Sequence, residues 1–311
     1  MYYKSIGDLN RTILTHIELI PSDTDLVVGI PRSGMVPAII IAQTLHLPFT
    51  DIHSFIAGRM FGEDESHHQV IDNKRYKNIL IVDDSVASGN AITKARAMLQ
   101  NLESLFTLKY CAIYIVPVKV KMVDIYFETL ALPQVFQWNV FHHTVLEKAC
   151  FDIDGVLCED PTLEQDDDGP LYRDFLINAK PLYIPECKIG TIVTSRLEKY
   201  RKETEEWLQK HNIRYNQLVM YNPGKTKKSD YIHPAALKAS VYKSLNYFLF
   251  IESSYYQARK INQITGKPVL CTEIFEMITE SESLMHNIRS GKYLPGTREF
   301  LLNIRRRVKG Y

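Results

Sequence analysis

Short apolar runs alternate with helix-like segments along the 311-residue chain, and this alternation limits the fold more than any other feature. Six runs read as buried strands, at residues 25–30, 78–84, 110–118, 149–154, 189–195 and 246–253. Helices are expected at residues 35–45, 87–102 and 197–213. Buried strands that alternate with helices are typical of parallel sheets with helices packed on them. We therefore predict an α/β fold.

The strands fall into two separate sets, which favours two domains. A prior of about 150 residues per domain also gives two for this length, and either half can bury an ordinary core. The boundary is expected within residues 141–148, so we predict domains at residues 1–145 and 146–311. An acid-rich stretch with little pattern, residues 158–170, follows the first strand of the second domain.

The composition is that of a globular protein in a reducing compartment. The net charge is +1, so the sequence gives no general attraction to nucleic acid or to an anionic membrane. The 5 cysteines have no paired spacing, which argues against a disulfide scaffold and a zinc ribbon. The start lacks a basic-then-apolar leader, and no apolar run reaches about 18 residues. We expect no transmembrane segment and a cytoplasmic location.

The stretch ILIVDDSVASGNAI (79–92) places two acids, Asp83 and Asp84, at the end of an apolar strand. Small residues follow and lead into a helix. Such a turn leaves backbone N–H groups free beside the positive end of a helix dipole, which suits a phosphate monoester. The acids can accept hydrogen bonds from vicinal hydroxyls. Together these features indicate a site for ribose 5-phosphate.

This stretch resembles the phosphoribosyl-pyrophosphate (PRPP) motif of type I phosphoribosyltransferases. The matching residues are Asp83, Asp84, Ser85, Val86, Ala87, Ser88 and Gly89, and Asn90 ends the expected phosphate loop. Ser88 stands where threonine is usual and keeps the hydroxyl, whereas Ala87 replaces another common threonine. The stretch VGIPRSGMVPA (28–38) resembles the pyrophosphate loop of that family, with Arg32 and Ser33 at its tip. The resemblance covers residues 1–145 and implies that PRPP binds here together with Mg²⁺.

Other interpretations stay open for some of these residues. Asp83 and Asp84 could hold Mg²⁺ or cap the strand end, and Arg32 could form a surface salt bridge. The resemblance places the loop that closes over PRPP within residues 58–75, where Arg59 is a candidate for contact with pyrophosphate. His67 and His68 in that loop are more often solvated than catalytic.

Three aromatic residues near the end of the first domain are candidates for the acceptor side: Phe136, Trp138 and Phe141. They could stack on a nucleobase, or they could form an apolar floor for a sugar or a lipid-linked acceptor. They could equally pack between the domains.

A second acid pair, Asp152 and Asp154, lies in the stretch CFDIDGVLCED (150–160). In an extended strand, residues i and i+2 point to the same side, so both carboxyls face one site. The first carboxylate can attack phosphorus, while the second transfers a proton at the leaving oxygen. Gly155 lets the chain turn away sharply. Metal-binding loops also use this pattern.

The stretch DIDGV resembles the first motif of the haloacid dehalogenase (HAD) superfamily, and later stretches resemble the others. The resemblance implies a Rossmann-like phosphatase domain with a small cap over residues 146–311, in which Asp152 is the nucleophile and Asp154 the acid and base. It assigns the phosphate-binding hydroxyl to Thr194, with Ser195 as the alternative, and the phosphate-binding lysine to Lys238, with Lys243 as the alternative. Mg²⁺ would be held by Asp152, by the Asp154 carbonyl and by Glu252; Ser253 stands where another acid is common. An inactive, structural HAD domain is the other interpretation.

A transferase that leaves a 5-phosphate on its product, followed by a phosphatase, indicates a two-step enzyme. This order resembles fused phosphoribosyltransferase–HAD proteins that make ribofuranose units of bacterial polysaccharides. That resemblance implies transfer of 5-phosphoribosyl from PRPP to a glycan acceptor, free or lipid-linked, and hydrolysis of the 5-phosphate. A nucleobase phosphoribosyltransferase joined to a 5′-nucleotidase and a non-catalytic PRPP sensor are the alternatives. A homo-oligomer and an association with glycosyltransferases are compatible with the sequence.

Overall fold

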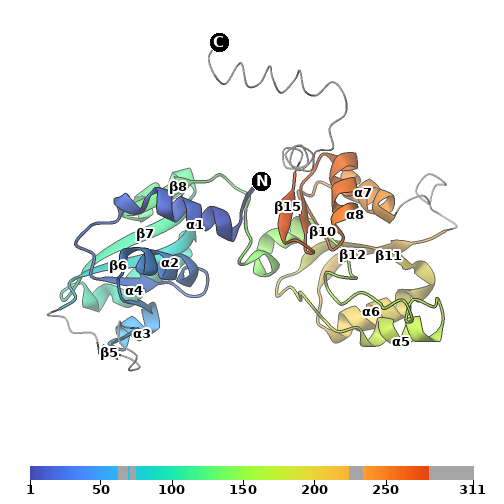
Figure 1. The fold of residues 1–311 in the computed structure, drawn as a ribbon, viewed down its shortest axis with the longest axis horizontal. Coiled ribbons are helices and arrows are strands. Elements are labelled where there is room, and N and C mark those ends of the chain that lie inside the picture. The colour runs from blue at the N-terminus through green and yellow to red at the C-terminus, as the bar shows by residue number, and fades with distance from the viewer. Residues whose placement is uncertain (62–68, 71–74, 224–233, 280–311) are drawn as a thin grey trace, which may run out of the picture. The chain divides into compact units, whose positions relative to one another are not determined.

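The computed structural model describes residues 1–61, 69–70, 75–223 and 234–279. The chain divides into two compact units, Met1–Val140 and Phe141–Tyr311, which are described separately. None of the helices in these described ranges is long and apolar enough to cross a membrane. Figure 1 shows the elements of each unit.

The first unit is built on a five-stranded parallel sheet in the order β3-β2-β6-β7-β8. Its strands are β2 (Leu26–Gly29), β3 (Phe49–Asp51), β6 (Asn78–Val86), β7 (Thr107–Ile115) and β8 (Ile125–Thr129). Two small ribbons accompany it: β1 (Tyr2–Lys4) pairs in parallel with β9 (Gln134–Phe136), and β4 (Arg59–Met60) pairs antiparallel with β5 (Gln69–Val70).

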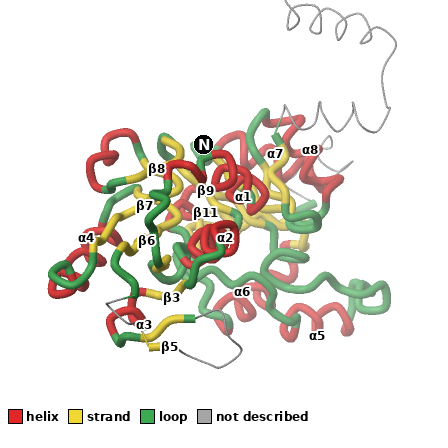
Figure 2. Tube along the Cα trace, turned by 60° about the vertical axis from the view of Figure 1, so that its left-hand side comes forward, coloured by secondary structure: helices red, strands yellow, loops and turns green. Residues whose placement is uncertain are grey.

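Helices cover both faces of this sheet, as two views show (Figures 1 and 2). Helices α1 (Ile6–Thr15) and α2 (Met35–Leu45) share a core with Val27, Leu80 and Val82. Helices α3 (Ile52–Ile56) and α4 (Asn90–Leu99) share the opposite core with Leu26, Val28 and Ile81. Successive strand residues therefore enter different cores, which explains why the strands are continuous apolar runs rather than alternating ones.

The second unit contains a six-stranded sheet in the order β12-β11-β10-β13-β14-β15, parallel except for β15. Its strands are β10 (Ala149–Phe151), β11 (Ile189–Leu197), β12 (Tyr215–Tyr221), β13 (Leu249–Glu252), β14 (Val269–Cys271) and β15 (Glu276–Ile278). Helices α7 (Pro234–Ser244) and α8 (Tyr255–Thr265) pack on one face around Cys150, Phe250 and Val269. Helices α5 (Pro170–Asn178) and α6 (Arg201–Lys210) lie on the other side (Figure 1).

Short 3₁₀ helices join some of these elements, at Ile17–Leu19, Gln100–Leu102, Pro117–Met122, Val140–His142, Thr144–Lys148 and Glu198–Tyr200. The predicted α/β class with parallel sheets is confirmed. The helix predicted at 35–45 has these bounds in the structure, whereas the one predicted at 87–102 begins at Asn90. Strand β6 runs on through Ser85 and Val86, which pair with Tyr114 and Ile115, and Gly89, at φ +87°, has a left-handed backbone that a right-handed helix cannot include.

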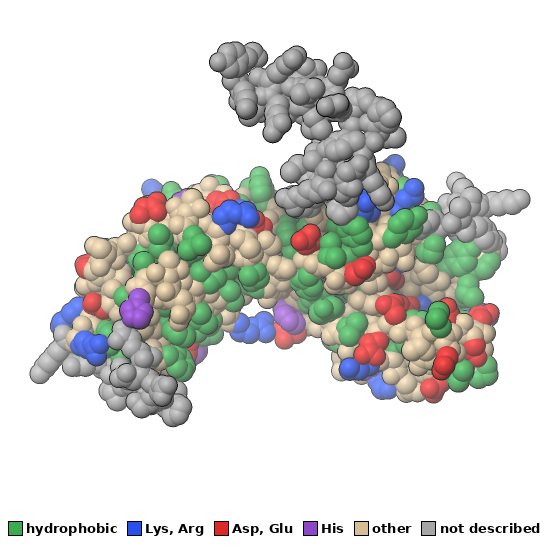
Figure 3. Space-filling view, viewed as in Figure 1, with side chains coloured by type: hydrophobic (Ala, Val, Ile, Leu, Met, Phe, Trp, Pro, Cys, Tyr) green, Lys and Arg blue, Asp and Glu red, His purple; other side chains and the backbone are tan. Residues whose placement is uncertain are grey.

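Charged side chains of both signs are distributed over the surface shown in Figure 3. Acidic side chains gather over the α5–α6 part of the second unit. On this face, the described basic side chains form no continuous patch, in keeping with the net charge of +1.

Candidate active sites

The two predicted PRPP loops meet because they follow neighbouring parallel strands. Strand β2 pairs with β6, with Gly29 opposite Val82, and Ile30 N donates to Val82 O at 2.9 Å. The loop with Arg32 and Ser33 therefore lies at the same sheet edge as the end of β6. Arg32 is exposed, Ser33 is half-buried, and the Pro31–Arg32 peptide bond is cis.

Gly34 allows this close approach. A Cβ atom at Gly34 would lie 2.6 Å from Ile30 O and 2.7 Å from Val82 O. Real Cβ atoms do not come this close to backbone oxygens, so a larger residue would push the loop away from the end of β6. The sequence IPRSG thus keeps the first loop against the acid pair.

Asp83 and Asp84 are both buried, at 5% and 4% exposure. Asp83 Oδ1 accepts a hydrogen bond from Asp84 N at 3.0 Å, and Asp84 Oδ2 accepts one from Trp138 Nε1 at 2.6 Å. Burial, together with the charge of Asp84, raises the pKa of Asp83 to about 8. Burial also raises the pKa of Asp84, against the opposing effect of the Trp138 hydrogen bond. The pair therefore resists carrying two negative charges.

The rest of the predicted phosphate loop is shorter than expected. Ser85 and Val86 belong to β6, and only Ala87, Ser88 and Gly89 lie between the strand and α4. Ser88 is exposed, and its Oγ accepts a hydrogen bond from Asn90 N at 3.3 Å. The turn still leads directly to the start of α4, at the carboxyl edge of the sheet.

The three aromatic candidates divide between the units. Phe136 and Trp138 stack in the first unit, with ring centroids 4.9 Å apart. Phe141 belongs to the second unit, where it stacks on Tyr183 at 4.5 Å. Phe141 is therefore not part of the same aromatic group. Arg59 is exposed on β4, and His67 and His68 lie outside the described residues.

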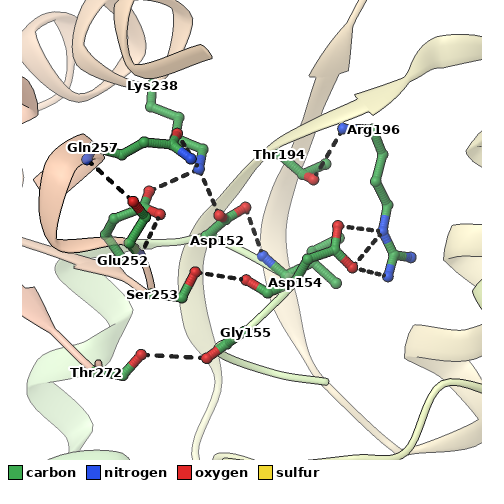
Figure 4. Close-up of polar contacts among 12 residues, drawn as sticks. Asp152, Asp154, Gly155, Thr194, Arg196, Lys238, Glu252, Ser253, Gln257 and Thr272 are labelled. Atoms are coloured by element: carbon green, nitrogen blue, oxygen red, sulfur yellow. Dashed lines mark hydrogen bonds and ion pairs between the residues drawn. The ribbon is translucent and has the colours of Figure 1, made fainter. Parts of the chain in front are cut away.

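The second candidate site forms where three adjacent strands end. Strand β10 lies between β11 and β13, and all three are parallel. Their carboxyl ends bring together Asp152 and Asp154 after β10, Arg196 on β11 and Glu252 on β13 (Figure 4). A pocket of about 490 Å³ opens there, lined among others by Asp152, Asp154, Asp160, Tyr183, Ser195 and Lys238.

Lys238, on α7, is buried between the acids (Figure 4). Its Nζ donates to Asp152 Oδ2 at 2.5 Å, to Glu252 Oε2 at 2.7 Å and to Gln257 Oε1 at 3.0 Å. Although burial lowers the pKa of Lys238, the charges of Asp152 and Glu252 raise it overall. Burial raises the pKa of Asp152. Burial and the negative charge of Asp152 together raise the pKa of Glu252 to about 8. The alternative lysine, Lys243, is exposed.

Asp154 has a partner that the sequence analysis missed. The fully buried side chain of Arg196 donates from Nε to Asp154 Oδ2 at 3.0 Å and from Nη2 to Asp154 Oδ1 at 2.6 Å. Although burial lowers the pKa of Arg196, the charge of Asp154 raises it overall. The sequence did contain a signal, because Arg196 follows Thr194 and Ser195 at the end of a predicted buried strand. An unpaired buried guanidinium is costly, so this position indicates an acidic partner.

The two hydroxyl candidates on β11 have different environments. Thr194 is fully buried, and its Oγ1 accepts a hydrogen bond from Arg196 N at 3.2 Å. Ser195 is exposed and lines the pocket. The geometry therefore gives Ser195 access to a ligand and gives Thr194 a local backbone contact.

The oxygen atoms near Asp152 fit the chemistry of Mg²⁺, which prefers carboxylate, carbonyl and water oxygens. Asp152 and Glu252 supply carboxylates, and the Asp154 carbonyl, which accepts from Ser253 Oγ at 3.0 Å, supplies a third oxygen. Gly155, at φ +71°, lets Ser253 approach, because a Cβ there would lie 2.4 Å from the Ser253 Cβ. Within the described residues, no three His, Cys, Asp or Glu side chains form a metal-holding group, so water would have to complete the shell.

Residues 3–147 match the family model of the phosphoribosyl transferase domain. These residues are a type I phosphoribosyltransferase domain. The acid pair and the loop with Arg32 and Ser33 both belong to this phosphoribosyltransferase domain.

Similar solved structures were found for the phosphoribosyltransferase domain. A xanthine-guanine-hypoxanthine phosphoribosyltransferase from Helicobacter pylori is 18% identical, with a TM-score of 0.35, over 45% of this chain and 92% of that one. A purine phosphoribosyltransferase from Pyrococcus horikoshii is 19% identical, with a TM-score of 0.32, over 44% of this chain and 92% of that one. No curated protein matches the chain.

Removing Lys238 should strongly destabilise the second unit. We expect Lys238→Met to lower the free energy of unfolding by about 3–5 kcal/mol at pH 7, because two buried carboxyls lose their cation. Lys243→Met, on the exposed side of the same helix, is the matched control and should change it by less than about 0.5 kcal/mol. Urea unfolding followed by Trp207 fluorescence in Trp138→Phe protein measures both. Equal effects of the two substitutions would contradict the assigned charge pairing.

The acid pair of the phosphoribosyltransferase domain should make stability depend on pH. The pKa of Asp83 is about 8 in the folded protein and about 3.9 in an unfolded chain. The proton is therefore bound more tightly in the folded state, and the stability that it contributes is lost progressively as pH rises from about 4 to about 8. We therefore compare the free energy of unfolding of Asp83→Asn with that of wild type. The difference should shift in favour of the variant by at least about 1.4 kcal/mol from pH 5 to pH 8, which is the equivalent of one pKa unit.

The measurement for Asp83 is urea unfolding at both pH values, followed by Trp138 fluorescence in Trp207→Phe protein. Asp23→Asn, at an exposed acid of the same unit, is the control. The same pH-dependent gain in that control would show that burial of the pair is not its cause.

Proposed function

We propose that the chain is a bifunctional enzyme that adds a ribofuranosyl residue to a glycan in two steps. The first site transfers 5-phosphoribosyl from PRPP to a glycan acceptor and releases pyrophosphate. The second site hydrolyses the 5-phosphate and leaves a ribofuranosyl residue. The observation that carries the proposal is the cluster of Asp152, Lys238 and Glu252 under a pocket, in the same chain as a phosphoribosyltransferase domain.

In the transfer step, the domain holds the two ends of the donor. Asp83 and Asp84 accept hydrogen bonds from the ribose hydroxyls, and the turn of Ala87, Ser88 and Gly89, between β6 and Asn90 at the start of α4, takes the 5-phosphate. Arg32 and Ser33 bind the pyrophosphate. As the bond from C1 to pyrophosphate breaks, positive charge develops on the ribose. The domain lowers the barrier because it fixes the 5-phosphate and the pyrophosphate of PRPP and stabilises the charge of the leaving pyrophosphate. Mg²⁺ bound with PRPP would offset the negative charge of the pyrophosphate.

In the second step, Asp152 attacks the phosphorus atom of the 5-phosphate. Its carboxylate oxygen forms a bond to phosphorus as the bond to the ribose 5-oxygen breaks, and Asp154, oriented by Arg196, supplies the proton to that oxygen. Water then attacks the aspartyl-phosphate, transfers a proton to Asp154 and releases inorganic phosphate. Lys238 neutralises negative charge at Asp152, and the Ser195 hydroxyl, or that of Thr194, bonds the phosphoryl oxygens. Mg²⁺ held by Asp152, Glu252 and the Asp154 carbonyl would offset phosphate charge.

The pairing of the two steps supports a polymer acceptor. Hydrolysis of a phosphate monoester makes the sequence irreversible, and it gives an unphosphorylated sugar. The stretch after residue 154 that precedes α5 is short, as expected for a site that admits a large substrate. The protein would then act in the cytoplasm on a free or lipid-linked glycan, alone, as a homo-oligomer or with glycosyltransferases.

A second candidate function is a nucleobase phosphoribosyltransferase joined to a 5′-nucleotidase. The half-buried indole of Trp138, which stacks with the buried rings of Tyr114 and Phe136, favours it, because such a ring can stack on a base. The stack begins beside Asp84, where the ribose is proposed to lie.

The products of wild type and Asp152→Asn separate these functions. Each protein is incubated with PRPP, Mg²⁺ and either a glycan or a set of nucleobases, and the products are weighed by mass spectrometry. We expect a ribosylated glycan from wild type and, from Asp152→Asn, a product heavier by one phosphate. The control, Asp84→Asn, should release little pyrophosphate and still hydrolyse p-nitrophenyl phosphate.

Other outcomes have distinct meanings. If only nucleobases become ribosylated, the glycan acceptor is wrong, and the second candidate function, a nucleobase phosphoribosyltransferase joined to a 5′-nucleotidase, is supported. Identical products from wild type and Asp152→Asn would contradict the phosphatase step. If PRPP binds but no pyrophosphate is released, the protein is a non-catalytic PRPP sensor and the proposed transfer step is wrong.

A further inference from the structure

Two side chains just after β9 reach the candidate PRPP site from outside the main sheet. Trp138 Nε1 donates to Asp84 Oδ2 at 2.6 Å, and Asn139 Nδ2 donates to Ser33 Oγ at 3.4 Å. Asp84 lies at the end of β6, and Ser33 lies in the loop after β2. Residues 136–139 therefore contact both halves of the site.

The indole of Trp138 is held in place by other rings. Phe136 stacks on Trp138 at 4.9 Å and 17°, and it stacks on Tyr114 at 5.5 Å and 19°. Tyr114 is fully buried on β7, beside β6 in the sheet, and Phe136 is buried as well. The stack therefore fixes the indole N–H relative to the strand that carries Asp84.

The chemistry of this contact leaves Asp84 able to bind a hydroxyl. An indole N–H can only donate, and a carboxylate has about four positions that accept. The bond to Trp138 uses one of them and sets the plane of the carboxylate. The Asp83 side chain and the N–H of Ser85 also bond this carboxylate, so a ribose hydroxyl would exchange with one of these contacts, in an orientation that the indole helps to set.

We propose that Trp138 is a positioning residue for the ribose of PRPP, whose indole N–H holds the Asp84 carboxylate in the orientation that accepts a ribose hydroxyl. The inference rests on the proposed placement of PRPP at Asp83 and Asp84. It also gives residues 136–139 a second role, because the segment proposed to face the acceptor contacts the group that binds the donor. Binding of PRPP therefore changes the surroundings of the indole before an acceptor arrives.

A double-mutant cycle on PRPP binding tests this positioning role. Trp138→Phe keeps a ring in the stack and removes the N–H, so the Kd for PRPP, measured by calorimetry with Mg²⁺, should rise about tenfold. In Asp84→Asn protein the same substitution should change Kd by about twofold or less, because its effect passes through the carboxylate. Equal losses in both backgrounds would mean a general structural role and would overturn the proposal. Trp207→Phe, in the second unit, is the control and should leave Kd unchanged.

Fluorescence provides a readout that does not need the weakened double variant. The chain has 2 tryptophans, so Trp138 is the only one in Trp207→Phe protein. Saturating PRPP with Mg²⁺ should shift its emission, and unchanged emission would overturn the proposal. If wild type does not bind PRPP at all, the proposed function fails as well; if wild type and Trp138→Phe bind it equally, only this inference fails.

Discussion

Parallel pairing of adjacent strands decides which side chains can meet in both units. The loop after β2 reaches Asp83 because β2 and β6 are neighbours, and Asp152 reaches Glu252 because β10 and β13 are neighbours. These residues are far apart in the sequence. Neither cluster would exist if another strand lay between these neighbours or if one of them ran in the opposite direction. The order and direction of the strands therefore bring the side chains of each site together.

The two acid pairs differ in how their charge is balanced. Asp152 and Glu252 share the ammonium group of Lys238, and Asp154 shares the guanidinium of Arg196. Asp83 and Asp84 are met instead by a backbone N–H and by the indole of Trp138. At Asp152, the proposed nucleophile, the charge of Lys238 opposes the rise in pKa that burial causes. At Asp83, the charge of Asp84 adds to that rise, and a pair that resists full ionisation suits hydrogen bonding to neutral hydroxyls.

Much of the architecture could be predicted from local sequence patterns, because buried parallel strands are continuous apolar runs and α2 has a clear apolar pattern. The ends of elements were less predictable: Ser85 and Val86 look like a polar turn, yet the pairing with β7 keeps them in the strand. Contacts between distant residues were the least predictable. The bond between Arg196 and Asp154 depends on the adjacency of β10 and β11. Phe141 lies near Trp138 in sequence, but it packs in the other unit.

The ribbon of β1 and β9 has a consequence for biosynthesis. Residues 2–4 have no strand partner in the described chain other than residues 134–136, so this pairing joins the two ends of the first unit. A ribosome makes the amino end of the ribbon first and must complete almost the whole unit before its partner emerges. Trp138 follows that partner directly, and the donor site is therefore assembled only as synthesis of the unit ends. A nascent chain that stops earlier would carry both PRPP loops without the contacts that join them to residues 136–139.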